Sequence, residues 1–98
     1  MTDPVEPLAI RAIISVKGRV QGVGYRAFAL GAASRRGLRG TVRNLEDGRV
    51  ELEVEGMKET ILGLTEDLKI GPPASRVTAV DIDWHPATGR FSGFHIRY

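Results

Sequence analysis

The chain has 98 residues, of which 42% are hydrophobic and 27% charged, and this composition is typical of one globular domain with a single small core. It contains no cysteine, which excludes disulfides, cysteine zinc sites, iron–sulfur clusters and thiol nucleophiles. The net charge of +2 conceals an uneven distribution, because residues 8–44 hold eight basic residues and no acid while the remainder carries all twelve acids. Such a basic half favours either an anionic partner or a solvated basic helix end.

The start of the chain, MTDPVEPLAI, differs in composition from the rest of the sequence. It places acids and prolines where a signal peptide needs basic residues and then an apolar stretch, and no segment approaches the roughly 20 apolar residues of a membrane span. We therefore expect a flexible N-terminal extension over residues 1–8, a domain over residues 9–98, a cytoplasmic location and no membrane association.

The first half of the domain predicts one strand followed by one helix. Apolar and polar residues mostly alternate over residues 10–17, which indicates a half-buried strand. From about residue 23 to residue 36, apolar side chains recur at helical spacing, and Gly37 is suited to end that helix. The two elements are joined by the glycine-rich, basic corner GRVQGVGYR, residues 18–26.

The second half predicts a hairpin, a second helix and two strands. Extended runs at residues 38–45 and 49–55 flank Asp47-Gly48, a strong hairpin signal. A helical stripe from Met57 to Leu68 ends at Gly71, and strands follow over residues 77–84 and in the short run 94–98. This order predicts an α+β, ferredoxin-like fold (split βαβ, βαββαβ plus a short C-terminal strand), with an antiparallel sheet and two helices on one face.

Several side chains are assigned by pattern alone. Three acids alternate with apolar residues and predict a solvated sheet face: Glu51, Glu53 and Glu55. Large aromatic side chains predict core positions for Phe28, Trp84 and Phe94. The two histidines, His85 and His95, predict surface or edge positions.

The corner at residues 18–26 has the composition of an anion site. Glycines let backbone N–H groups converge without side-chain obstruction, and the unsatisfied amides at a helix start favour phosphate. Arg26, in the first helical turn, has a planar fork that can bind two phosphate oxygens. The alternative is that Gly18, Gly22 and Gly24 merely permit a tight turn.

Two nucleotide-binding motifs are excluded by what surrounds the corner. Gly22, Gly24 and Ala27 fit the dinucleotide fingerprint, but an Asp-Gly turn follows Glu46 at once and the chain is too short for a doubly wound sheet. A Walker motif would need Gly-Lys-Ser or Gly-Lys-Thr, and neither sequence is present.

Two longer segments carry a family resemblance. GRVQGVGYR at residues 18–26 and GTVRNLEDGRVELEVEG at residues 40–56 closely resemble the two signature segments of acylphosphatases. The likeness extends through GPPASRV at residues 71–77 and the ending FHIRY, so it covers nearly the whole chain after Leu8. Thr41 departs from the pattern, since the family often places an aromatic residue at this position.

The resemblance implies metal-independent hydrolysis of acyl phosphates, which are carboxyl-phosphate mixed anhydrides, to a carboxylate and inorganic phosphate. It implies that Arg26 and the loop amides hold the phosphoryl group while Asn44 orients the attacking water. On residues alone, an asparagine before a hairpin is more often a turn or edge residue than a catalyst, so the role of Asn44 depends on the resemblance. The resemblance implies that the reaction needs neither a metal nor a cofactor. It also implies that phosphate is bound, mainly by backbone amides, at Val20, Gln21, Gly22, Val23, Gly24, Tyr25 and Arg26.

Two other functions stay open on the sequence. An RNA-binding module would share the ferredoxin-like topology and the basic first half, but its sheet stacks bases on aromatic side chains. The corresponding face here would present acids beside Arg11, Ile13 and Ser15, so we expect no nucleic-acid partner. A catalytically idle adaptor is the other alternative, because fold does not fix function. We expect a monomer whose partners are a small acyl phosphate and inorganic phosphate.

Overall fold

A computed structural model describes residues 9–98 of the chain. The expected flexible extension at residues 1–8 lies outside the described residues. Two helices and five strands follow one another in the predicted order: β1 (Ile10–Arg19), α1 (Tyr25–Arg35), β2 (Arg39–Asn44), β3 (Val50–Gly56), α2 (Lys58–Ile70), β4 (Arg76–Pro86) and β5 (Phe94–Ile96).

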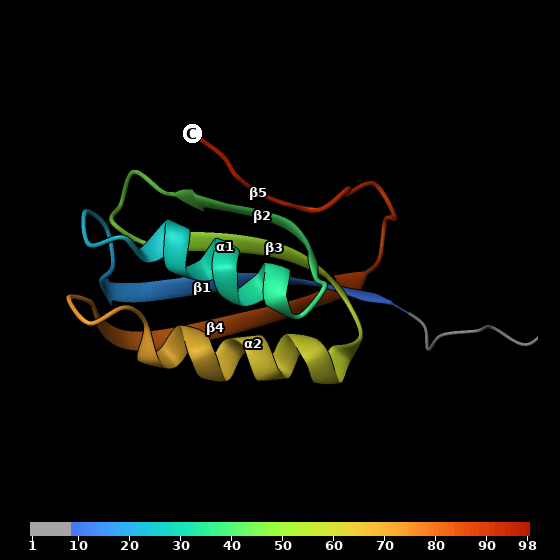
Figure 1. The fold of residues 1–98 in the computed structure, drawn as a ribbon, viewed down its shortest axis with the longest axis horizontal. Helices are drawn as coiled ribbons and strands as arrows, with labels where there is room; N and C mark the ends of the chain where they lie inside the picture. Colours follow the sequence, from blue (N-terminus) through green and yellow to red (C-terminus); the bar gives the residue numbers. More distant parts are fainter. Residues whose placement is uncertain (1–8) are drawn as a thin grey trace, which may run out of the picture.

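The five strands form one sheet in the order β4-β1-β3-β2-β5. Neighbours among β4, β1, β3 and β2 pair antiparallel, as the ferredoxin-like prediction requires. The short β5 pairs parallel with β2, which makes the sheet mixed rather than wholly antiparallel. Because β4 and β5 occupy opposite edges, residues 87–93 cross one end of the sheet to reach β2 (Figure 1).

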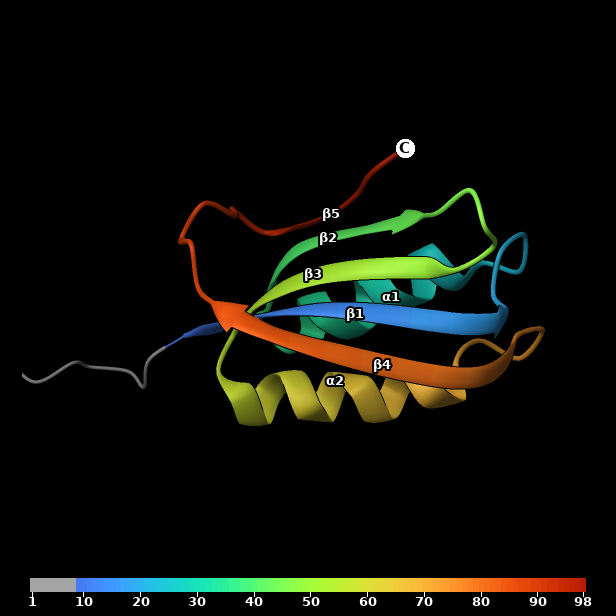
Figure 2. The ribbon, with the colours of Figure 1, turned by 180° about the vertical axis from the view of Figure 1, so that it is seen from behind.

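Both helices cover the same face of the sheet, and the opposite face is open in the reverse view (Figure 2). The core lies between these two layers, where the alternating apolar residues of the strands meet α1 and α2. Tyr25 is buried in α1, and its hydroxyl donates to the backbone oxygen of Leu68 in α2 at 2.7 Å. This bond ties the two helices together beneath the sheet.

The aromatic side chains fill the core only in part. Phe94 is buried as predicted, whereas Phe28 and Trp84 are half-buried. Trp84 lies at the β4 edge, and the Lys58 ammonium stands 5.3 Å from its ring centroid. The core prediction was therefore wrong for Phe28 and holds only in part for Trp84, which packs against the core from an edge strand that leaves one side of its ring uncovered.

The open face carries charges rather than aromatic rings on its central strands. In the β1–β3 register, Arg11, Ile13 and Ser15 lie opposite Glu55, Glu53 and Glu51. Arg11 donates to Glu53 at 2.9 Å, and Arg43 pairs with Glu51 at 3.0 Å. This face is therefore a network of ion pairs.

Glu55 does not belong to a solvated face, so that prediction was wrong. Its side chain is 1% exposed, and it accepts bonds from the amide and hydroxyl of Thr88, both at 2.6 Å, and from the Gly89 amide at 2.9 Å. The crossing segment 87–93 places these donors over the end of β3. Burial by itself raises the pKa of Glu55, but the Thr88 and Gly89 bonds and the Arg11 charge outweigh it and hold the pKa below its ordinary value.

This contact should make stability depend on pH. Because the folded pKa of Glu55 is lowered, its contribution is complete above the ordinary glutamate pKa of about 4.3 and is lost as pH falls through the folded value. Glu55→Gln cannot accept the same three bonds, so we expect the free energy of unfolding at pH 7 to fall by about 2 kcal/mol. Urea unfolding between pH 7 and pH 3 measures both effects.

Glu46→Gln is the matched control, because Glu46 is exposed in the hairpin turn at the far end of the sheet. We expect this variant to keep the parent's stability and acid sensitivity. Equal stability of Glu55→Gln and the parent at pH 7 would contradict the role given to the buried carboxylate.

Neither helix of the described chain is long and apolar enough to cross a membrane.

Candidate functional site

Three segments meet at the end of the sheet that lies away from the crossing segment. The loop after β1, the turn between β2 and β3, and the C-terminus all lie at this end in Figure 1. Arg26 lies in the first turn of α1 and Asn44 ends β2. The fold therefore brings the two proposed catalytic residues to one end of the molecule, although they are 18 positions apart in the sequence.

A cavity of about 230 Å³ opens between these segments. Arg26 and Asn44 both line it, and so do four of the other predicted phosphate-binding residues. Its complete lining is Val20, Gly22, Gly24, Tyr25, Arg26, Ala27, Asn44, Ile96 and Tyr98. The glycine-rich corner is thus one wall of an open cavity rather than only a tight turn.

The start of α1 lines this cavity and carries amides that lie outside the helical ladder. Its first helical bond runs from the Phe28 amide to the Gly24 oxygen at 3.1 Å, so the amides of the residues before Phe28 precede the helical ladder. Within the described chain, no side chain caps this helix and no acid lies in its first turn. The positive end of the helix dipole is therefore available to an anion.

Gly22 and Gly24 give the loop its shape. Their φ angles are +75° and +81°, in the left-handed region that L side chains rarely adopt. A Cβ at either position would meet no atom within 4 Å, so the requirement for glycine comes from backbone conformation and not from crowding by the protein. This conformation turns the chain from β1 into α1 while keeping the amides unobstructed.

Arg26 is a half-buried cation in the lining of this cavity. No ion pair among residues 9–98 includes it, whereas the guanidinium groups of Arg11, Arg43 and Arg49 are each bound to a carboxylate. Its guanidinium carbon lies 4.9 Å from the ring centroid of Tyr98. The face of this ring attracts the cation and leaves its N–H donors available for an oxyanion.

Asn44 lines the same cavity. Its Oδ1 is buried and has no hydrogen-bond partner among the described residues. A buried polar atom without a partner costs about 1 to 3 kcal/mol, so such atoms in native proteins call for an explanation. An amide oxygen beside an anion site can accept a hydrogen bond from a water molecule.

Two predicted phosphate-binding residues lie outside the cavity lining. Val23 is half-buried against the core, and the Gln21 side chain points to the hairpin, where its Nε2 donates to the Leu45 and Arg49 oxygens. The sequence prediction missed Ala27, Ile96 and Tyr98. The alternating ending 94–98 was visible, but its parallel pairing with β2 was not, and that pairing carries the C-terminus to the cavity.

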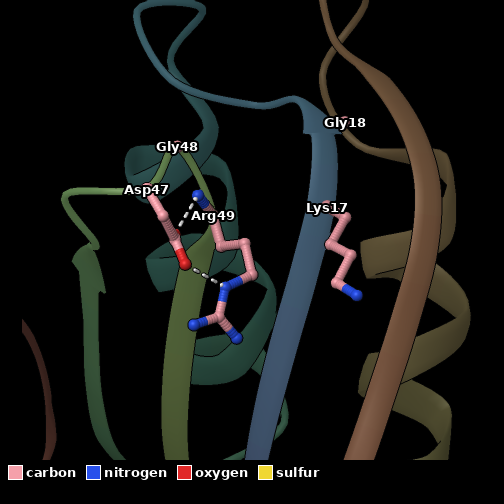
Figure 3. Close-up of a pocket in the computed structure, with 5 residues that line it drawn as sticks. All are labelled: Lys17, Gly18, Asp47, Gly48 and Arg49. Atoms are coloured by element: carbon pink, nitrogen blue, oxygen red, sulfur yellow. Dashed lines mark hydrogen bonds and ion pairs between the residues drawn. The ribbon is translucent and has the colours of Figure 1, made fainter.

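A larger cavity of about 520 Å³ lies at the ends of β1 and β3, lined by Lys17, Gly18, Asp47, Gly48 and Arg49 (Figure 3). Its cations already have partners. Arg49 donates to Asp47 at 2.8 Å and to Ser15 at 2.9 Å, and Lys17 stands 4.0 Å from Asp81. With both charges compensated and no helix start among the lining residues, this cavity is less suited to an anion than the one at Arg26.

The histidines lie away from the Arg26 cavity. His85 is on β4 and contacts Asp83 at 3.0 Å, while His95 is exposed on β5 with its ring nitrogen 2.6 Å from the Ser92 oxygen. Over residues 9–98 no group of three or more histidine, aspartate or glutamate side chains is arranged to hold a metal ion.

The fold and the Arg26 cavity define a ferredoxin-like α+β domain with a site suited to an oxyanion at one end of its sheet. Comparisons with known proteins identify the family to which this domain belongs. The family model described as Acylphosphatase matches residues 12–96. The chain is 50% identical over 86 residues to an acylphosphatase of Thermus thermophilus, covering 88% of this chain and 97% of the relative. An acylphosphatase of Anaeromyxobacter dehalogenans is 46% identical over 89 residues, covering 91% and 96%.

A solved structure agrees with these sequence matches. The crystal structure of an acylphosphatase from Bacillus subtilis matches with a TM-score of 0.87 at 38% identity, covering 91% of this chain and 99% of that chain. The chain therefore belongs to the acylphosphatase family, and it is an enzyme.

Proposed function

We propose that the enzyme hydrolyses acyl phosphates to a carboxylate and inorganic phosphate at the cavity lined by Arg26 and Asn44. One observation carries the proposal: a single cavity is lined by the start of α1, by Arg26, which has no counterion among residues 9–98, and by Asn44, whose buried Oδ1 has no partner among those residues. The first two bind the phosphoryl group, and the third receives the water that attacks it. A small acyl phosphate is accordingly the substrate.

The reaction requires few further groups from the protein. A water oxygen forms a bond to phosphorus as the bond from phosphorus to the acyl oxygen breaks, and the electron pair of that bond leaves on the carboxylate. Because the leaving carboxylic acid has a pKa near 4, it departs as an anion at neutral pH without a general acid. The water's protons pass to the product phosphate and the solvent. Positioning and charge stabilisation are the main demands of such a phosphoryl transfer.

The two residues divide these demands between them. Arg26 and the amides before Phe28 bind the phosphoryl oxygens, whose charge spreads during the transfer. The Asn44 Oδ1 accepts a hydrogen bond from the water and aligns its lone pair with phosphorus. Neither task uses a metal ion or a cofactor, so we propose that the reaction requires neither, and that one chain suffices.

Release of inorganic phosphate tests the proposal. We expect rapid release from acetyl phosphate and none above background from a phosphate monoester such as glycerol phosphate, because an alkoxide leaving group would need a proton donor. Inorganic phosphate should inhibit competitively, since the product occupies the same site. A chelator such as EDTA should leave the rate unchanged.

Three results would contradict this function. They are equal hydrolysis of ester and anhydride, purely noncompetitive inhibition by phosphate, and loss of turnover in EDTA that an added divalent metal restores.

A further inference from the structure

Gln21 connects the two halves of the site. Its Nε2 donates to the backbone oxygens of Leu45 at 2.8 Å and Arg49 at 2.9 Å, which uses both hydrogens of the amide group. Leu45 directly follows Asn44, and the Leu45 amide donates to the Arg49 oxygen at 2.8 Å, closing the base of the hairpin turn. One side chain therefore reaches from the loop after β1 to the base of the hairpin turn beside Asn44.

The backbone itself provides no such link. The pairing of β1 with β3 ends at Val16 opposite Val50, so the loop after β1 and the turn before β3 lie beyond the last rung of the ladder. Among the hydrogen bonds of the described residues, the two from Gln21 are the only ones that join residues 20–24 to residues 45–49. Without them, no hydrogen bond among the described residues would join the loop directly to the turn.

We infer that Gln21 is a positioning residue that sets Asn44 at its working distance from the phosphoryl group. This inference rests on the proposed function. Arg26 and the amides form one half of the site, and Asn44 forms the other half on a separate element. A displacement of about 1 Å between reacting groups can cost about 10²-fold in rate, so a link across the two halves affects turnover.

Glutamine suits this role by its chemistry and its length. Two carbonyl oxygens need two N–H donors on one group, which a carboxylate cannot supply at neutral pH. Gln21→Glu keeps the size of the side chain but turns both contacts into repulsions between oxygens. Gln21→Asn keeps the amide but shortens the side chain by one carbon, so it cannot make both bonds from the same backbone.

The inference predicts a split between turnover and phosphate affinity. For Gln21→Ala and Gln21→Glu we expect kcat for acetyl phosphate to fall about tenfold or more, with the inhibition constant of inorganic phosphate within about twofold of the parent. A residue that only stabilised the fold would alter neither quantity in the folded protein. Circular dichroism and urea unfolding identify conditions in which each variant is folded, and Glu46→Ala, an exposed change in the same turn, should keep the parent's kcat.

A double-mutant cycle then shows whether Gln21 acts through Asn44. In the Asn44→Ala background, Gln21→Ala should lower kcat by less than about twofold, because the group that it positions is already absent. Full additivity of the two losses would overturn the inference, as would a loss of phosphate affinity in Gln21→Ala equal to its loss of kcat. A folded Gln21→Ala variant with the parent's kcat would overturn it as well.

Failure of the inference is distinguishable from failure of the proposed function. If the parent releases no phosphate from acetyl phosphate, the function itself is wrong. If the parent is active and Asn44→Ala is impaired while Gln21→Ala is not, only the positioning role is wrong.

Discussion

Arg26→Ala is expected to lose phosphate binding and turnover together. Arg26 has no counterion among residues 9–98 and lines the cavity beside the start of α1, and we propose that its guanidinium touches the phosphoryl group both before and during the reaction. We expect kcat/KM for acetyl phosphate to fall about 10³-fold. The inhibition constant of inorganic phosphate should rise by about tenfold or more, because a charge-assisted pair of bonds is lost.

Arg26→Lys separates charge from geometry. Lysine keeps the positive charge but has no planar fork, so the variant should stay impaired by about 10²-fold if two phosphoryl oxygens are bound at once. Arg35→Ala is the matched control, because it removes the same charge from the exposed last turn of the same helix. An Arg26→Ala protein inhibited by phosphate as strongly as the parent would refute the assignment.

Much of the fold could be predicted because its signals are local. The Asp47-Gly48 pair marked the hairpin, and Gly48 indeed has a positive φ of +97°. Gly37, with φ of +68°, follows the end of α1 as a glycine after a helix commonly does. Periodicity gave the buried faces of the strands and of α2, because alternating or helically spaced apolar residues need no partner to be recognised.

The features that the sequence did not reveal depend on contacts between distant segments. Glu55 fits the alternation of a solvated strand face, and only the crossing segment that carries Thr88 and Gly89 buries it. Tyr98 reaches Arg26 only because β5 pairs with β2 at the far edge of the sheet. No local pattern encodes either contact.

The two proposed site residues differ in the same way. Arg26 was proposed from its place at the start of a helix after a glycine-rich loop, a pattern with a physical reason of its own. Asn44 was proposed only through the family resemblance, since an asparagine at the end of a strand is ordinarily a turn residue. The structure adds the unpartnered Oδ1, which distinguishes this asparagine from a turn residue that satisfies its own amide.

Asn44→Ala should fail in a different way from Arg26→Ala. Asn44 is proposed to contact the attacking water and not the phosphoryl group, so the inhibition constant of inorganic phosphate should stay within about twofold of the parent. Turnover depends on the aligned water, and we expect kcat to fall about 10²-fold or more, the scale found when one preorganised catalytic hydrogen bond is removed. Steady-state kinetics with acetyl phosphate, with and without inorganic phosphate, measure both quantities.

The stability of Asn44→Ala toward urea tests the same assignment independently of the kinetics. Because the buried Oδ1 has no partner among residues 9–98, removing it relieves a desolvation cost, so Asn44→Ala should be as stable as the parent or slightly more stable in urea. Loss of activity with retained or increased stability is typical of a residue kept for function.

Unlike Asn44→Ala, Asn44→Asp should weaken phosphate binding, since a carboxylate would face the anion in the cavity. Near-normal kcat in folded Asn44→Ala would exclude its proposed role, and a large loss of stability would show that Oδ1 has a structural partner in solution.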